Sequence, residues 1–123
     1  MKLELFEIVE AYQSFDAILK NNEIKFSLAW KLADVIEPLK KHVERFNEER
    51  NKIIKEFGTE QPDTGQFIVE KAKISAFETK LNEVGKTSVE IKNVAKIEKK
   101  ELLESEIKIN RAVNLKALKL FLI

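Results

Sequence analysis

The longest periodic segment of the chain sets the scale of its fold. Between Leu28 and Phe57, apolar residues recur at helical spacing, at positions 28, 32, 35, 39, 43, 46, 53 and 57. At 1.5 Å per residue, a helix over this segment has about 30 residues and measures about 45 Å. A neighbouring helix of ordinary length covers only about half of it. We therefore expect a second element to pack along the remainder.

Three residues bear on where this helix begins, bends and ends. Ser27 is placed to act as its N-cap, and Gly58 stands where a helix end favours a residue that can adopt positive φ. Pro38 lies inside the segment and removes one backbone hydrogen bond, which predicts a kink. Because the apolar phase continues from Val35 to Leu39, the pattern favours one kinked helix over two separate helices.

A second amphipathic segment precedes the long one. Apolar residues fall at positions 5, 8, 12, 15 and 19, which predicts a helix over residues 2–20. The pair Asn21-Asn22 follows, and asparagine tolerates the left-handed conformation in which many helices end. Since the connection to the long helix is short, we expect an antiparallel helical hairpin over residues 1–58.

The rest of the chain predicts shorter elements. Residues 61–65 (Gln-Pro-Asp-Thr-Gly) read as a loop, and residues 66–69 as a short strand or a lead-in to a third helix that ends at Gly85. Alternation of apolar and charged residues predicts strands at 89–91 and 107–109, separated by one helical turn or a wide connection at 98–105. Asn114 is placed to cap a last helix over residues 115–123.

Together these segments predict an α+β fold in one domain spanning 1–123. Its first part is the long antiparallel helical hairpin, and residues 66–123 add a third helix, a small antiparallel β element and a short C-terminal helix. The chain has the size of an ordinary single domain, with 44% hydrophobic and 35% charged residues. The opening residues lack the apolar region of a signal peptide, so we predict neither export nor membrane insertion.

Charge is distributed unevenly along the chain, although the total is only +1. Residues 1–85 carry 13 basic and 16 acidic side chains, whereas residues 86–123 carry 9 basic and 5 acidic ones. This asymmetry favours contact between the two parts or head-to-tail association of copies. The near-neutral total argues against a dedicated nucleic-acid binder, and acidic residues are interleaved with the basic ones in the last third.

Several catalytic classes lack the residues that they need. His42 is the only histidine and there is no cysteine, which excludes a multi-histidine metal site and cysteine-based chemistry within one chain. The glycines at 58, 65 and 85 do not form a dinucleotide or phosphate-binding loop. We expect His42 to be a half-buried side chain at the helix seam. The sequence predicts no enzyme, no cofactor and no bound metal.

Six residues are candidates for contact with a partner. Trp30 either marks a binding surface or packs at the closed end of the hairpin. Glu48 and Arg50 lie in a polar turn of the long helix that is either solvated or meets a partner's polar surface, and the acids there could also bind a cation. The apolar terminus must be buried in its own domain or in a neighbour, for which another copy is the leading candidate; its candidate contacts are Leu120, Phe121 and Ile123.

Several stretches resemble a family of small proteins of unknown function encoded by tailed bacteriophages and prophages of Gram-positive bacteria. They are the opening Lys-Leu-Glu-Leu-Phe-Glu-Ile-Val-Glu-Ala-Tyr, the Ser-Leu-Ala-Trp-Lys-Leu-Ala segment, the stretch from Val43 to Gly58, and the Leu-Lys-Ala-Leu-Lys-Leu-Phe-Leu-Ile terminus. The resemblance implies a phage protein made in the host cytoplasm, with virion association among the expectations. It implies no catalytic residues.

The function expected from the sequence is a non-enzymatic interaction protein, as a virion or tail assembly factor or a small structural subunit. Its partner would be a phage or host protein, and a homo-oligomer is also consistent with the apolar terminus. The alternatives are a phage-encoded inhibitor of a host enzyme or defence protein, and a weak nucleic-acid-binding accessory protein.

Overall fold

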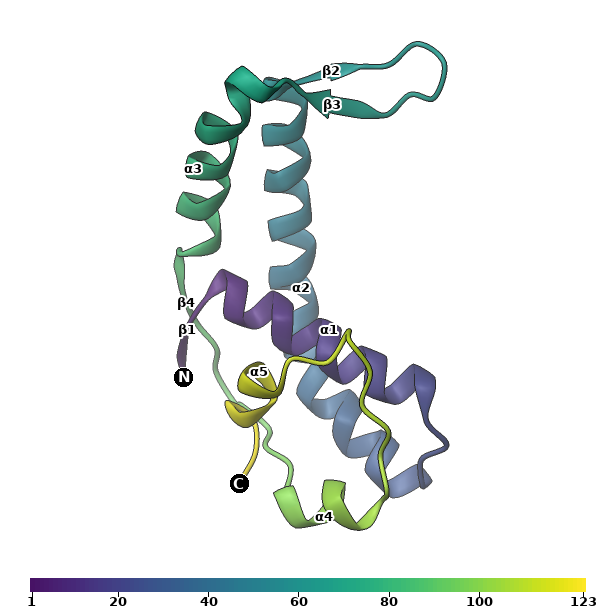
Figure 1. The fold of residues 1–123 in the computed structure, drawn as a ribbon. Helices are drawn as coiled ribbons and strands as arrows, with labels where there is room; N and C mark the ends of the chain where they lie inside the picture. Colours follow the sequence, from purple (N-terminus) through teal and green to yellow (C-terminus); the bar gives the residue numbers. More distant parts are fainter.

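The two predicted helices form the centre of the molecule in a computed structural model that describes residues 1–123. Helix α1 (Leu5–Asn21) packs against the first half of helix α2 (Phe26–Phe57) as an antiparallel hairpin (Figure 1). The α+β fold class is confirmed, since five α-helices are joined by two small antiparallel sheets. No helix combines the length and the apolar character needed to cross a membrane.

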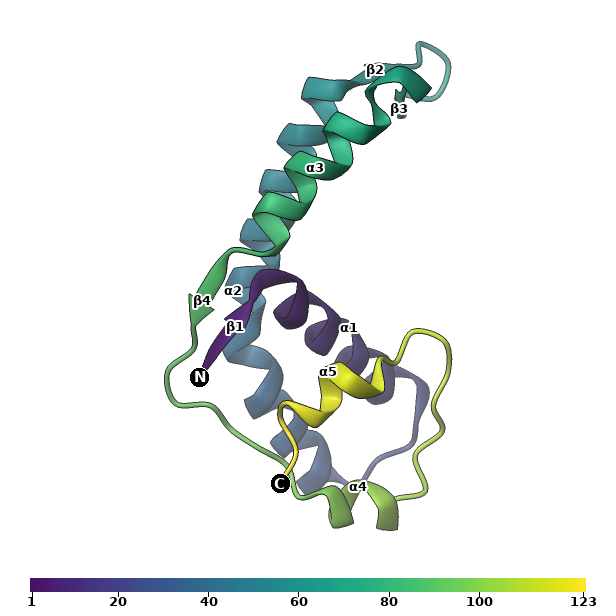
Figure 2. The same ribbon diagram turned by 60° about the vertical axis from the view of Figure 1, so that its left-hand side comes forward.

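Helix α2 is continuous for 32 residues, with Pro38 inside it. The ribbon changes direction where it passes α1 in both Figure 1 and Figure 2, as expected of a helix that contains a proline. The predicted cap is wrong, because the N-cap is Lys25 and Ser27 lies inside the helix. Gly58 ends α2 as predicted, but its φ is −96°, so the expected positive φ is wrong. It provides space instead, since an added Cβ would come within 2.6 Å of the Ile54 carbonyl oxygen.

The second half of α2 and helix α3 (Ile74–Gly85) form a stalk that extends away from α1 (Figure 2). Phe57 of α2 and Phe77 of α3 meet edge to face, with ring centroids 6.4 Å apart. The expected second neighbour of the long helix is therefore the third helix. At the tip, strands β2 (Gly58–Glu60) and β3 (Phe67–Val69) form a hairpin around the predicted loop, followed by a 3-10 turn over Lys71–Lys73.

The other sheet corrects the prediction at the start of the chain. Residues predicted as the first turn of α1 form strand β1 (Lys2–Glu4), which pairs antiparallel with β4 (Ser88–Glu90). Helix α1 begins only after Glu4, whose backbone N–H donates to the Glu7 carboxylate in a capping box. The expected strand near residue 89 is present, whereas the one at 107–109 is wrong: that segment is irregular and follows helix α4 (Lys99–Glu104).

The apolar core lies where α1, α2 and the C-terminal region meet. Its 18 buried residues come from the hairpin and from the last third of the chain. Phe15 of α1 and Phe121 meet edge to face at 6.0 Å and are both almost fully buried. Helix α5 (Leu115–Lys119) is shorter than predicted, because the residues after it turn back to Ile97. The Ile123 N–H donates to the Ile97 carbonyl at 2.9 Å, and the Ile97 N–H donates to the Phe121 carbonyl at 3.0 Å.

Candidate functional site

The most distinctive surface feature is an apolar groove between α4, α5 and the segments that follow them. We call it the C-terminal groove. Its volume is about 550 Å³, within the range of protein binding sites. Nine of its twelve lining residues are apolar, and the others are two lysines and one glutamate. The lining residues are Ile18, Lys99, Leu102, Leu103, Glu106, Ile107, Ile109, Leu115, Leu118, Lys119, Leu122 and Ile123.

The floor of the groove is buried, whereas its rim is open to solvent. Ile18 of α1 and Leu118 of α5 are at most 4% exposed and belong to the core. Four large apolar side chains of the lining are more than half exposed: Leu103, Ile109, Leu115 and Ile123. Monomeric proteins seldom expose apolar side chains in such a cluster, and contiguous patches of this kind mark interaction sites.

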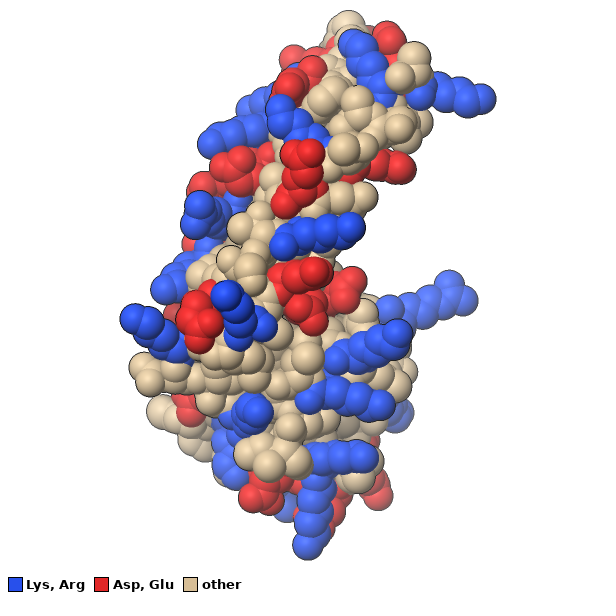
Figure 3. Space-filling view, turned by 90° about the vertical axis from the view of Figure 1, so that its left-hand side faces the viewer, with Lys and Arg blue, Asp and Glu red and all other residues tan.

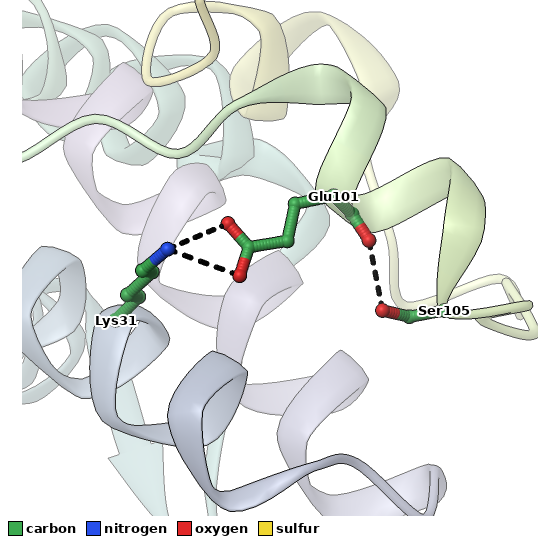
Figure 4. A network of polar contacts seen from close by, with 3 residues as sticks. All are labelled: Lys31, Glu101 and Ser105. Carbon is green, nitrogen blue, oxygen red and sulfur yellow. Dashed lines mark hydrogen bonds and ion pairs between the residues drawn. The ribbon is translucent and has the colours of Figure 1, made fainter.

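One wall of the groove is held by an ion pair between α2 and α4. The Lys31 ammonium contacts both carboxylate oxygens of Glu101, at 2.9 and 3.1 Å (Figure 4). On the same helix, the Ser105 hydroxyl donates to the Glu101 carbonyl at 2.8 Å and ends the turn. These contacts hold α4 against the start of α2, so that its apolar side is presented to the groove.

The opposite wall is held by asparagine side chains. Asn114 caps α5, because its side-chain oxygen accepts from the N–H groups of Lys116 and Ala117. The same residue joins α5 to α1, where its amide donates to the Glu10 carboxylate at 2.9 Å. The cap predicted at Asn114 is confirmed.

A second asparagine fixes the irregular segment between α4 and α5. The Asn22 side chain accepts from the Lys108 N–H at 2.8 Å and donates to the Lys108 carbonyl at 3.2 Å. Its backbone is extended, with a φ of −134°, so the expected left-handed helix end is wrong. Asn22 instead closes a loop of 86 residues beside the exposed Ile109.

Basic residues lie beside the apolar surface of the groove. Residues 107–123 contain four basic residues and no acidic residue: Lys108, Arg111, Lys116 and Lys119. All four are exposed, and neither they nor Lys99 forms an ion pair. Figure 3 views the molecule from the side on which β1 and β4 lie; there, basic side chains predominate over the broad lower part, whereas basic and acidic ones alternate along the stalk. The groove therefore suits an apolar ligand with flanking negative charge.

The chain was compared with protein-family models, with curated proteins and with solved structures. None matches it.

The predicted contact residues fall into three places. Of the apolar terminus, Ile123 lines the groove, Phe121 is buried in the core of its own chain, and Leu120 is partly buried. Glu48 and Arg50 lie exposed on the second half of α2 and are not part of the groove. No cluster of histidine, cysteine or acidic side chains with the arrangement of a metal site is found there or elsewhere in the chain.

Trp30 lies in a third place, near the start of α2. The prediction that it packs at the closed end of the hairpin is wrong. The side chain is 62% exposed on the outer side of α2, where its ring contacts that of Phe26 at an interplanar angle of 55°, with 5.6 Å between centroids. The alternative, a binding surface, remains. Since neither ring lines the groove, the molecule has two separate exposed apolar surfaces at its broad end.

His42 lies in α2 as a half-buried side chain, as predicted. Burial lowers its pKa below the ordinary value of 6.5, and the neighbouring charges of Lys41 and Arg45 lower it further. The groove contains no histidine, and its titratable side chains are Lys99, Glu106 and Lys119. Its lining is suited to holding a ligand by burial of apolar surface.

Most lining residues of the groove are not among the contacts predicted from the sequence. The sequence pattern predicts a helical turn or wide connection at Leu103, a strand at Ile109 and a helix at Leu115, and it predicts a partner contact at none of them. The available signal was the coincidence of large apolar residues with the acid-free stretch 107–123. What brings them to one surface is the fold of α4 and α5 onto the hairpin.

Proposed function

We propose that this chain is a non-enzymatic interaction protein that binds an apolar segment of a protein partner in its C-terminal groove. The observation that carries the proposal is the group of four large apolar side chains exposed around one groove, Leu103, Ile109, Leu115 and Ile123. Leaving such a surface in water is unfavourable by about 25 cal/mol for each Å² that a partner could cover.

The biological setting we propose is the assembly of a tailed bacteriophage, with this chain as an assembly factor or a small structural subunit. The resemblance of four stretches of the sequence to a phage protein family supports this setting. The genes on either side of the coding sequence test it. Tail or virion genes on both sides would support assembly, whereas early host-takeover genes would contradict it and favour an inhibitor of a host protein.

Binding in the groove can be tested with a defined probe. The probe is a fluorescently labelled synthetic helix with leucines on one face and glutamates on the other, and its anisotropy is measured while the protein is added. We expect binding that weakens as salt is raised, because the lysines of the groove are exposed and screened.

The matched variants are Ile109→Ser in the groove and Ile68→Ser in strand β3 at the tip of the stalk. The two isoleucines are 54% and 55% exposed, so each change removes the same side chain from an equally open site. We expect Ile109→Ser to weaken binding of the probe and Ile68→Ser to leave it unchanged. Equal binding by the two variants, or no binding by the unmodified protein, would overturn the proposal.

A further inference from the structure

We propose that the occupant of the C-terminal groove is a second copy of this chain, which inserts the contacting rings of Phe26 and Trp30. The inference rests on the proposed function, because it names the partner of the same groove. It accounts for both exposed apolar surfaces at the broad end of the molecule, which the fold of one chain leaves uncovered.

The inserted surface is a preorganised aromatic pair. Phe26 and Trp30 are 78% and 62% exposed, and they stand one turn apart in the first two turns of α2. Their rings already contact each other, with centroids 5.6 Å apart. A rigid aromatic pair on a helix is a typical interface anchor, since little conformational entropy is lost when it is buried.

The charges around this pair are complementary to those of the groove. Asp34 and Glu37 follow on α2 over the next two turns, because positions 26, 30, 34 and 37 are spaced by four, four and three residues. Asp34 stands at the edge of the side that carries the aromatic pair, where it lines a shallow hollow with Lys96 and Ile123 of its own chain. Both carboxylates are exposed, and neither forms an ion pair. We call Phe26, Trp30, Asp34 and Glu37 the aromatic face.

The groove presents the opposite charge beside its apolar lining. Lys99 and Lys119 line it directly, and Lys108, Arg111 and Lys116 belong to the acid-free stretch that forms its wall. A partner that inserts Phe26 and Trp30 would carry Asp34 and Glu37 toward a surface rich in free lysines. Such complementarity sets the orientation and speeds the encounter of the two copies.

The aromatic face cannot fill the groove of its own molecule. The ion pair between Lys31 and Glu101 holds α4 against α2 immediately beside Trp30, and neither aromatic ring is among the groove's lining residues. Docking must therefore join two copies through different surfaces. Such a heterologous contact builds chains or rings of subunits when it is repeated in one direction.

The size of the contact predicts modest affinity. Together the two aromatic side chains bring at most about 300–500 Å² to the interface, which is below the about 800 Å² per partner found in standard interfaces. We therefore expect association in the micromolar range, weakened by salt. This is the behaviour of a subunit that assembles at high local concentration.

Sedimentation velocity of the purified protein over a wide range of concentration tests the inference. We expect the unmodified chain to associate, and Trp30→Ala and Ile109→Ser each to weaken association about tenfold or more, as loss of an interface anchor does. Ile68→Ser is the matched control and should associate normally. A strictly monomeric unmodified protein, or association that none of these changes affects, would overturn the inference.

Mixing two deficient variants provides a second test. Trp30→Ala retains an intact groove and Ile109→Ser retains an intact aromatic face, so neither should associate alone, whereas the mixture should form a heterodimer. Reversal of charge gives an independent measurement: Glu37→Lys and Lys119→Glu should each weaken association, and mixing the two should restore it. Failure of both mixtures to associate would contradict the assigned pairing.

The two proposals fail in different ways. A monomeric protein that still binds the leucine-glutamate probe, with loss in Ile109→Ser, would reject the second copy as occupant and leave the groove as the site for another protein. An unmodified protein that neither self-associates nor binds the probe would reject both proposals. Far-ultraviolet circular dichroism of each variant shows whether the fold is retained, and since all substituted side chains are exposed, we expect that it is.

Discussion

The Ser14 hydroxyl accepts a hydrogen bond from the backbone N–H of Asn114 at 2.8 Å, across 100 residues of sequence. Ser14 is fully buried in α1 and is the only buried polar residue of the chain. Asn114 begins α5, so this contact, together with that between Asn114 and Glu10, anchors one wall of the groove on the hairpin. The stability of the groove should therefore depend on a residue that does not line it.

Replacing Ser14 by alanine tests this anchor. The change leaves the Asn114 N–H without its partner in a partly buried position, which costs about 1–3 kcal/mol of unfolding free energy. Urea denaturation measures the loss, and Ser75→Ala, on the exposed surface of α3, is the control that should change stability little. Equal stability of the two variants would show that Ser14 does not hold the wall.

Gly85 at the end of α3 is buried against the aromatic ring of Phe6, and an added Cβ would overlap that ring. Phe6 packs edge to face on Phe46, with centroids 5.7 Å apart, so its ring has little room to move. We expect Gly85→Ala to cost about 1–3 kcal/mol, although alanine normally favours a helix. In a Phe6→Leu background the same change should cost less; a penalty of equal size there would contradict the steric explanation.

Phe46 is predicted to be one of the most sensitive positions in the core. It is 5% exposed on α2 and packs against Phe6 of α1. Truncation to alanine removes most of a buried ring and should cost about 3–5 kcal/mol. Ile68→Ala, at an exposed position of strand β3, should stay within about 0.5 kcal/mol. A melting temperature for Phe46→Ala that matches the unmodified protein would show that this region is not a packed core.

The helices were predictable because their pattern is local. The apolar positions of α2 from Leu28 to Ile53 that sequence spacing selects are the ones that the structure buries, and the third helix ends at Gly85 as predicted. The strand pairing was not predictable in the same way. Residues 2–4 are predicted as the first turn of α1, yet they pair with residues 88–90, and no local signal indicates which segment is their partner.

The candidate site was the least predictable part, for a related reason. Ile123 is a predicted contact because it belongs to an apolar terminus that needs a partner surface, whereas the alternation of Ile109 with charged neighbours predicts a strand. Its position in the groove depends on Asn22, 86 residues before Lys108, which holds the irregular segment on the hairpin. Contacts over such distances in sequence leave no periodic signal, and the groove they build was visible only as scattered apolar residues.

His42 predicts a dependence of stability on pH. Its pKa is lowered in the folded protein by burial and by Lys41 and Arg45, whereas the unfolded chain should titrate near the ordinary value of 6.5. Between these two values the unfolded state binds more protons, so the free energy of unfolding rises with pH. The contribution of His42 is therefore complete above pH 6.5 and is lost as the pH falls through the lowered pKa of the folded state. Urea denaturation across this range measures the slope. Because His42 is the only histidine of the chain, His42→Gln should remove its part of the slope, and an unchanged slope would show that another group is responsible.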